Sequence, residues 1–112
     1  MKIAIPLAGG RLAMHFGHCE QFAVVDVDET TRQRRGTAVL AAPSHEPGLL
    51  PRWLHEQGAD IILAGGMGQR AQQLFAEKGI RVVYGVPSDT PEAVVTNFLD
   101  GTIVTGENPC DH

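Results

Sequence analysis

Potential metal ligands are concentrated in two short stretches of the sequence. The chain has five His and two Cys, and five of these seven residues are His15, His18, Cys19, Cys110 and His112. Imidazole and thiolate are borderline-to-soft ligands that favour Zn, Fe, Cu or iron–sulfur species. Three of them close together, in a stretch without helical or strand periodicity, indicate a candidate metal or metal–sulfur site.

The spacing of these ligands leaves several arrangements open. A closed structural zinc site needs four ligands and the chain has no Cys-x-x-Cys pair, but a simpler zinc-like site of His15, His18 and one Cys stays an alternative. The two imidazoles can also bond to backbone groups of their loop without any metal. The ending Cys110–His112 either folds over a bound metal species as a flap or is an ordinary flexible chain end.

A glycine-rich turn is the second candidate feature. Gly65, Gly66, Met67 and Gly68 stand between a predicted strand and a predicted helix. Glycine lets the backbone approach a ligand, and a helix start offers N–H groups with positive polarity, so an anion suits this position. The turn matches neither a dinucleotide-binding fingerprint nor a P-loop, and a tight turn without a ligand is the alternative. Met67 then adds a soft thioether or fills a gap.

The composition of the whole chain excludes several classes of protein. A chain of 112 residues makes one domain, which we place at residues 1–107, with a flexible Cys/His tail at 108–112. Nine Lys and Arg against 13 Asp and Glu give a net charge of −4, which argues against a nucleic-acid partner. No apolar run approaches the ~18 residues of a membrane span, and the first one is too short for a signal peptide. We therefore expect a cytoplasmic protein.

Catalytic arrangements find little support in the sequence. Ser44 and Ser88 are the only serines, and neither stands in a nucleophile-elbow context. A dyad of Cys19 and a His has no assignable orienting residue. The first predicted strand, Lys2–Leu7, carries no carboxylate, which disfavours a two-metal phosphodiester mechanism. We expect a binding protein and not an enzyme.

The elements that must position these residues predict an α/β fold. Short apolar runs predict five strands, at Lys2–Leu7, Phe22–Asp28, Arg34–Leu40, Ala59–Ala64 and Ile80–Tyr84. Apolar stripes at helical spacing predict three helices, over 50–57, from the glycine turn to 78, and from 91 until Gly101 closes it. Short links between the first three strands predict an antiparallel meander, and the alternating second half predicts parallel crossover units. The result is a five-stranded mixed sheet flanked by helices, with residues 8–21 as a loop and residues 102–107 as a short strand-like end.

Several segments together give the chain a resemblance to a known family. They are Lys2–Pro6, His15–Cys19 with Phe22, Ala59–Asp60 leading to Gly65–Gly68, Glu46–Pro51 with Trp53 and Leu54, and Cys110–His112. Over nearly its whole length the chain resembles the dinitrogenase iron–molybdenum cofactor biosynthesis family. The resemblance implies a three-layer, ribonuclease-H-like fold without the nuclease carboxylates. It also implies a carrier or chaperone for an anionic iron–molybdenum cluster, another metal–sulfur cluster or a precursor, with partner proteins that donate or accept it.

Carried over by position, the resemblance implies one cluster site formed by the His15–Cys19 stretch and the glycine turn. The cluster-binding residues are then His15, Phe16, Gly17, Gly65, Gly66, Met67 and Gly68, and the metal ligands are His15, His18, Cys19, Cys110 and His112. Helix-start N–H groups stabilise the charge of such a cluster, and His or Cys takes its open metal positions. Two other functions stay open, namely zinc-like metal binding and a metal-free module that binds a small anion or a partner protein.

Overall fold

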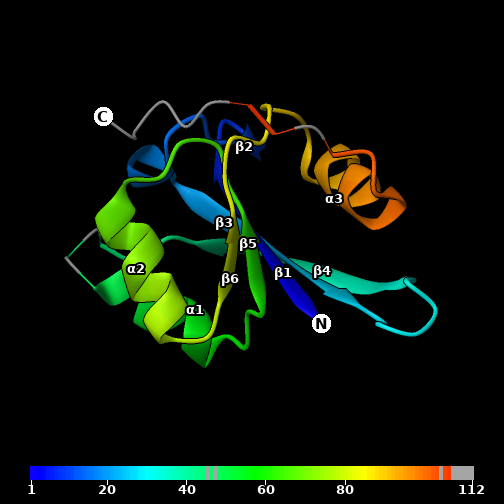
Figure 1. Ribbon diagram of the computed structural model, residues 1–112, viewed down its shortest axis with the longest axis horizontal. Coiled ribbons are helices and arrows are strands. Elements are labelled where there is room, and N and C mark those ends of the chain that lie inside the picture. Colours follow the sequence, from blue (N-terminus) through cyan, green and yellow to red (C-terminus); the bar gives the residue numbers. More distant parts are fainter. Residues whose placement is uncertain (45, 47, 104, 107–112) are drawn as a thin grey trace.

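A mixed sheet of six strands forms the middle layer of the computed structural model, which describes residues 1–44, 46, 48–103 and 105–106 (Figure 1). The strands are β1 (Lys2–Ala8), β2 (Arg11–Leu12), β3 (Gln21–Val27), β4 (Arg34–Ala41), β5 (Ile61–Leu63) and β6 (Arg81–Val83). Their order is β4-β3-β1-β5-β6, with β2 paired to β1. Strands β1, β3 and β4 are antiparallel, whereas β1, β5 and β6 are parallel. The predicted meander followed by parallel units is confirmed.

Helices cover both faces of this sheet (Figure 1). They are α1 (Leu49–Glu56), α2 (Gln69–Glu77) and α3 (Pro91–Asp100). Successive side chains of a strand point to opposite faces, so Ile3 and Ile5 of β1 pack in one cluster with Val95 of α3, while Ala4 joins the cluster of Phe75 of α2. No helix among the described residues is long and apolar enough to cross a membrane.

The edge of β1 that faces β5 changes partner along its length. The start of β1 pairs with β5, whereas Leu7 and Ala8 pair with β2. Pro6 lies between these two ladders and has no N–H to donate, while its carbonyl oxygen accepts a hydrogen bond from the Ala13 N–H (2.8 Å). The chain leaves β1 towards β3 and leaves β5 towards β6. In open α/β sheets such a reversal is where a crevice for ligands forms, beyond the carboxyl ends of the strands.

Three details of the predicted fold are wrong. The sheet has six strands and not five, because Arg11–Leu12 returns from the Gly9–Gly10 turn to pair with the end of β1. Residues 8–21 are therefore not a simple loop, and they also contain a 3-10 helix at Phe16–His18. Residues 102, 103, 105 and 106 do not form the predicted strand, and the Gly106 N–H donates to the Gly85 carbonyl oxygen (2.7 Å) without forming a strand ladder. The ribonuclease-H-like assignment stays a prediction.

Candidate functional site

The stretch around His15 and the glycine turn after β5 lie against each other. The Gly66 N–H donates to the Met14 carbonyl oxygen (2.6 Å), and the Phe16 N–H donates to the Gly66 carbonyl oxygen (2.8 Å). These bonds make an isolated parallel bridge between His15 and Gly66. The chain that follows β1 and the chain that follows β5 are thus hydrogen-bonded to each other beyond the end of the β1–β5 ladder. Main-chain atoms set the distance between these two segments.

Gly65 marks the closest approach of the two segments. A Cβ atom at this position would lie 2.6 Å from the Met14 carbonyl oxygen and 2.7 Å from the Ala13 carbonyl oxygen. The Gly65 carbonyl oxygen in turn accepts a hydrogen bond from the Gly85 N–H (2.8 Å). Glycine is required here by packing of the backbone, whether or not a ligand binds nearby.

A cavity of about 640 Å³ opens where these segments meet α1 and α2. This volume falls within the roughly 300–1,000 Å³ typical of small-molecule sites. Five of the predicted cofactor-binding residues line the cavity, namely Phe16, Gly17, Gly66, Met67 and Gly68. Among the described residues, the lining does not include the other two, His15 and Gly65.

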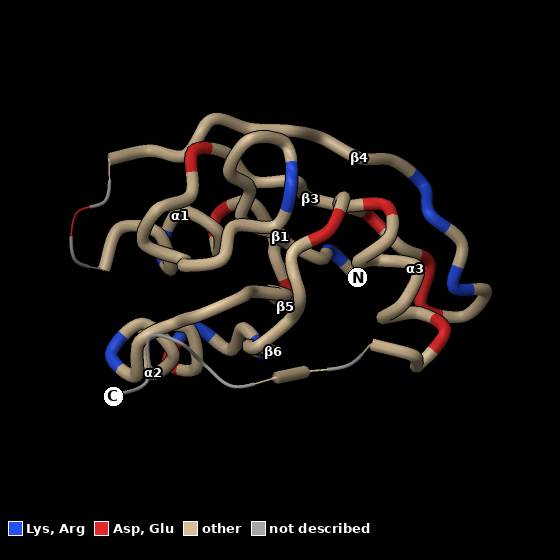
Figure 2. Tube along the Cα trace, turned by 90° about the horizontal axis from the view of Figure 1, so that it is seen from above, with Lys and Arg blue, Asp and Glu red and all other residues tan. Residues whose placement is uncertain are grey.

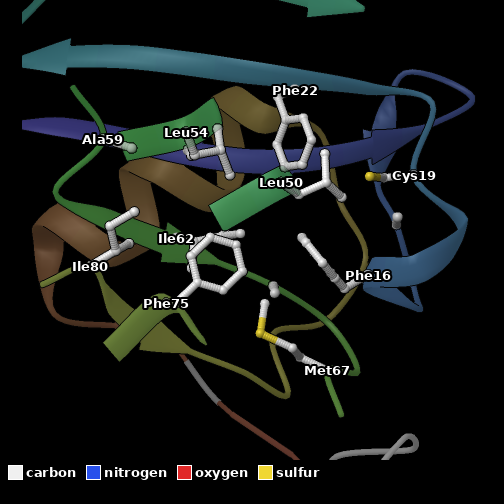
Figure 3. Packing of buried hydrophobic residues seen from close by; sticks show 13 residues of the cluster. Phe16, Cys19, Phe22, Leu50, Leu54, Ala59, Ile62, Met67, Phe75 and Ile80 are labelled. Carbon is white, nitrogen blue, oxygen red and sulfur yellow. The ribbon is translucent and has the colours of Figure 1, made fainter. Parts of the chain in front are cut away.

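The wall of the cavity is mainly apolar, with charged groups of both signs. Figure 3 shows Phe16, Leu50 and Met67 at the same end of the buried cluster that fills the space between the sheet, α1 and α2. Glu46 and Arg70 are its charged lining residues in the part of the chain that the structure describes, and both are exposed. The site therefore has an apolar floor and charged groups at its opening.

The N-termini of α1 and α2 both reach this cavity, and neither has a side-chain cap. In α1 the Leu49 N–H already donates to the Glu46 carbonyl oxygen (3.1 Å), and Pro51 has no N–H. The N-cap residues of the two helices, Gly48 and Gly68, line the cavity, supply no side-chain cap, and are followed by a first turn without acidic residues. Helix α3 on the opposite face differs, because the Thr90 hydroxyl accepts a hydrogen bond from the Ala93 N–H (3.3 Å) and Glu92 lies in the first turn. A helix start without a cap or an acid keeps its positive polarity available to a bound anion.

The 3-10 helix brings the predicted ligands His15 and His18 together. Residues three apart are eclipsed in this helix type, and the His18 N–H donates to the His15 carbonyl oxygen (3.0 Å). The two rings meet edge to face, with centroids 5.5 Å apart and planes at 62°. His15 is half-buried and His18 is exposed. Both flank the cavity residues Phe16 and Gly17 in the sequence.

Cys19 lies in the core of the protein. Its side chain is only 4% exposed and belongs to the cluster that contains Phe16 and Phe22 (Figure 3). Burial raises the pKa of the Cys19 thiol to about 11, whereas a metal ligand must be a thiolate. These features favour a packing role for Cys19 over the predicted role as a metal ligand.

The described residues do not assemble a conventional metal site. In residues 1–44, 46, 48–103 and 105–106 there is no group of three or more His, Cys, Asp or Glu side chains placed to hold a metal ion. The zinc-like alternative therefore has no ligand set in that part of the chain. The predicted tail, 108–112, with its candidate ligands Cys110 and His112, lies outside the described residues.

Helix α1 forms part of the cavity wall, a contribution that the ligand pattern of the sequence does not predict. Gly48, Leu50 and Pro51 line the cavity together with Glu46. A signal was present, since Glu46–Pro51 is one of the segments that carry the family resemblance. This segment holds no imidazole or thiol among its side chains, so a search for soft metal ligands passes over it.

The chain is similar to known proteins over most of its length. The model of the family described as dinitrogenase iron-molybdenum cofactor matches residues 1–101. The chain is 26% identical over 106 residues to the uncharacterized protein MJ0580 of Methanocaldococcus jannaschii, a match that covers 92% of this chain and 89% of the relative. It is 31% identical to PH0822, whose crystal structure matches with a TM-score of 0.87 over 96% of both chains. The apo form of the orange protein from Desulfovibrio gigas is 27% identical, with a TM-score of 0.72 over 96% of this chain and 94% of that one.

Proposed function

We propose that this chain, which belongs to the dinitrogenase iron-molybdenum cofactor family, binds an anionic metal–sulfur cluster or its precursor in the cavity beside Gly66–Gly68 and carries it without catalysing a reaction. The observation that supports this best is the meeting of the α1 and α2 N-termini at one cavity, where their N-cap glycines supply no side-chain cap and their first turns hold no acidic residue. Family membership suggests a metal–sulfur cluster as the cargo, and the positive polarity of the two helix N-termini fits the negative charge of such a cluster.

The positive polarity that such a cargo needs comes from a few local groups. The chain as a whole has a net charge of −4, so its overall field repels an anion. Each helix N-terminus is equivalent to roughly half a positive charge. Arg70 in the first turn of α2 adds a full positive charge, which the carboxylate of Glu46 in the same lining opposes. A second arginine, Arg11, does not add to this charge, because it is paired with other groups. Its guanidinium lies 3.6 Å from the Asp89 carboxylate and donates to the Ser88 carbonyl oxygen (3.4 Å).

His15 and His18 are the proposed ligands for open metal positions on the cargo. Their rings adjoin each other next to the cavity residues Phe16 and Gly17, and neutral imidazole binds iron and related metals. We retain Cys110 and His112 as proposed ligands from the chain ending. A small number of ligands suits a carrier, because the cargo must pass from a donor protein to an acceptor protein.

The proposal is tested by reconstitution under anaerobic conditions. The full chain is incubated with iron, sulfide and molybdate, desalted, and examined by visible absorption and by metal and sulfide analysis. We expect charge-transfer bands and co-eluting metal and sulfide. A protein that stays colourless and metal-free after desalting would count against a metal–sulfur cargo.

One arginine variant and one lysine variant test whether the cargo binds at this cavity. Arg70 and Lys78 are both exposed and lie at opposite ends of α2, so each can lose its charge without a change in the core. Arg70→Gln is expected to lower cargo uptake, whereas Lys78→Gln is expected to behave as the wild type. Equal losses in the two variants would show that the cargo responds to the net charge of the protein and not to this cavity.

A further inference from the structure

The outer edge of β4 has no partner strand within the part of the chain that the structure describes. β4 is the last strand of the sheet and pairs with β3 on one side only. It is eight residues long, and seven of these residues are exposed. Such an edge presents a row of alternating N–H and C=O groups that can pair with another strand.

This edge also lacks the features that usually prevent pairing. Natural edge strands are protected by being very short, by Pro, by bulges or by charged side chains. The charges of β4 are confined to Arg34 and Arg35 at its start, as the blue segment in Figure 2 shows, and the irregularity of the β3–β4 ladder lies at the same end. The remaining segment, Gly36–Ala41, has neither charge nor Pro, and Val39 within it is 54% exposed. The opposite edge strand, β6, is protected by its length of three residues.

We infer that β4 pairs with β4 of a second copy of this chain, antiparallel about a two-fold axis near Thr37 or Ala38. The same patch then serves on both copies, as a two-fold interface requires. The positions of the charges allow β4 to pair with a copy of itself in this direction without opposing like charges. Antiparallel pairing places Arg34 and Arg35 of each copy against the uncharged end of the other strand, with the two pairs of arginines roughly 20 Å apart.

A parallel arrangement of two β4 strands fits less well. It would place the arginines of the two copies side by side, and like charges directly opposite each other destabilise a strand pair. The antiparallel dimer joins the two sheets into one continuous sheet. No β4 residue is among the described residues that line the cavity, so this inference is independent of the proposed function.

Sedimentation velocity of the full chain tests the dimer. The wild type is expected to shift from monomer to dimer as its concentration rises to about 1 mM. Val39→Lys places a charge in the middle of the edge, and two-fold symmetry repeats it in both copies, so we expect the dimer to weaken by about tenfold or more. Gln73→Lys, at an exposed position on α2, makes the same change in charge and should dimerise as the wild type does.

Hydrogen exchange gives a second measurement that does not depend on a variant. Amides of β4 are expected to exchange more slowly at high protein concentration than at low concentration, while the other exposed amides stay unchanged. A wild type that remains monomeric at about 1 mM, a Val39→Lys variant that dimerises like the wild type, or β4 exchange that does not depend on concentration would each overturn the inference. Circular dichroism of Val39→Lys checks that the variant is folded.

Discussion

A carboxylate at position 68 is expected to strengthen the fold and to weaken binding of the cargo. Gly68 is the N-cap of α2, and its φ of −65° and ψ of 155° are open to any L-amino acid. A Cβ atom there would meet no other heavy atom within 4 Å, so Gly68→Asp introduces no strain. The new carboxylate can cap the first turn of α2, as Thr90 caps α3, but it also stands at the cavity that Gly68 lines.

The two effects of Gly68→Asp have opposite signs and can be estimated. Exchange of Gly for Asp at an N-cap gains a few tenths of a kcal/mol, and the charge adds roughly 0.3–1 kcal/mol through the helix dipole. A domain of this size should then melt roughly 2–5 °C higher. Repulsion between unit charges at roughly 6 Å, with an effective dielectric of about 40, is about 1.4 kcal/mol. For a dianion this weakens binding by about 100-fold.

Tetrathiomolybdate, a coloured metal–sulfide dianion, is a suitable probe for this prediction. Its binding is followed by visible absorption at low ionic strength, together with the thermal unfolding of each variant. Gly68→Asn is the matched control, because Asn caps a helix nearly as well as Asp and carries no charge. We expect Gly68→Asn to bind somewhat more weakly than the wild type, because its side chain takes up N–H groups of the first turn, and Gly68→Asp to bind much more weakly still, with the difference between the two variants shrinking as salt is added. Equal binding of the probe by Gly68→Asp and Gly68→Asn would refute this prediction.

Three further predictions concern packing and ionisation. Gly65→Ala should cost roughly 2–4 kcal/mol of unfolding free energy, because its Cβ would overlap two backbone carbonyl groups. In the control Gly17→Ala the new Cβ meets nothing within 4 Å, so thermal unfolding should stay almost unchanged. Equal effects of the two variants would contradict this packing. Hydrogen bonds from two backbone N–H groups and a guanidinium hold the pKa of Asp28 well below its usual range. Since a lowered pKa in the folded state stabilises the protein above the unfolded pKa, Asp28→Asn should melt lower than the wild type near pH 7, and the gap should narrow below about pH 4; a gap that does not change with pH would argue otherwise. Burial raises the pKa of the Cys19 thiol to about 11. An alkylating reagent near pH 8 should therefore label Cys19 only after denaturation, as located by peptide mapping. Rapid labelling of Cys19 in the native protein would disprove its burial in the core.

Segments with strong local signals could be predicted from the sequence. Helix α3 begins after Thr90 and ends before Gly101 because a capping hydroxyl, a Pro in the first turn and a closing glycine are all local features. The central strand β1 is recognisable as a short apolar run. Strand β2 was missed because two residues cannot show a period, and its pairing depends on the turn at Gly9–Gly10.

The site was predictable only in part, because its assembly depends on distant residues. The residue types at His15–Cys19 and at Gly65–Gly68 indicated candidate segments, but the bonds between Met14 and Gly66 join positions far apart in the chain. The direction of the Cys19 side chain could not be read from its type, since cysteine is both a frequent ligand and one of the most buried residues. The α1 wall carries no soft ligand, so its part in the cavity follows only from the fold.

The bridge between the His15 stretch and Gly66 has a consequence for how a site of this kind changes during evolution. The bonds that hold the two halves of the cavity together use N–H and C=O groups, which almost every residue type provides. Gly65 is restricted by its crowded backbone. Exposed side chains such as His18 can therefore be exchanged while the frame persists. Such a lineage can adapt to a cargo of another size or metal content through few substitutions, without rebuilding its fold.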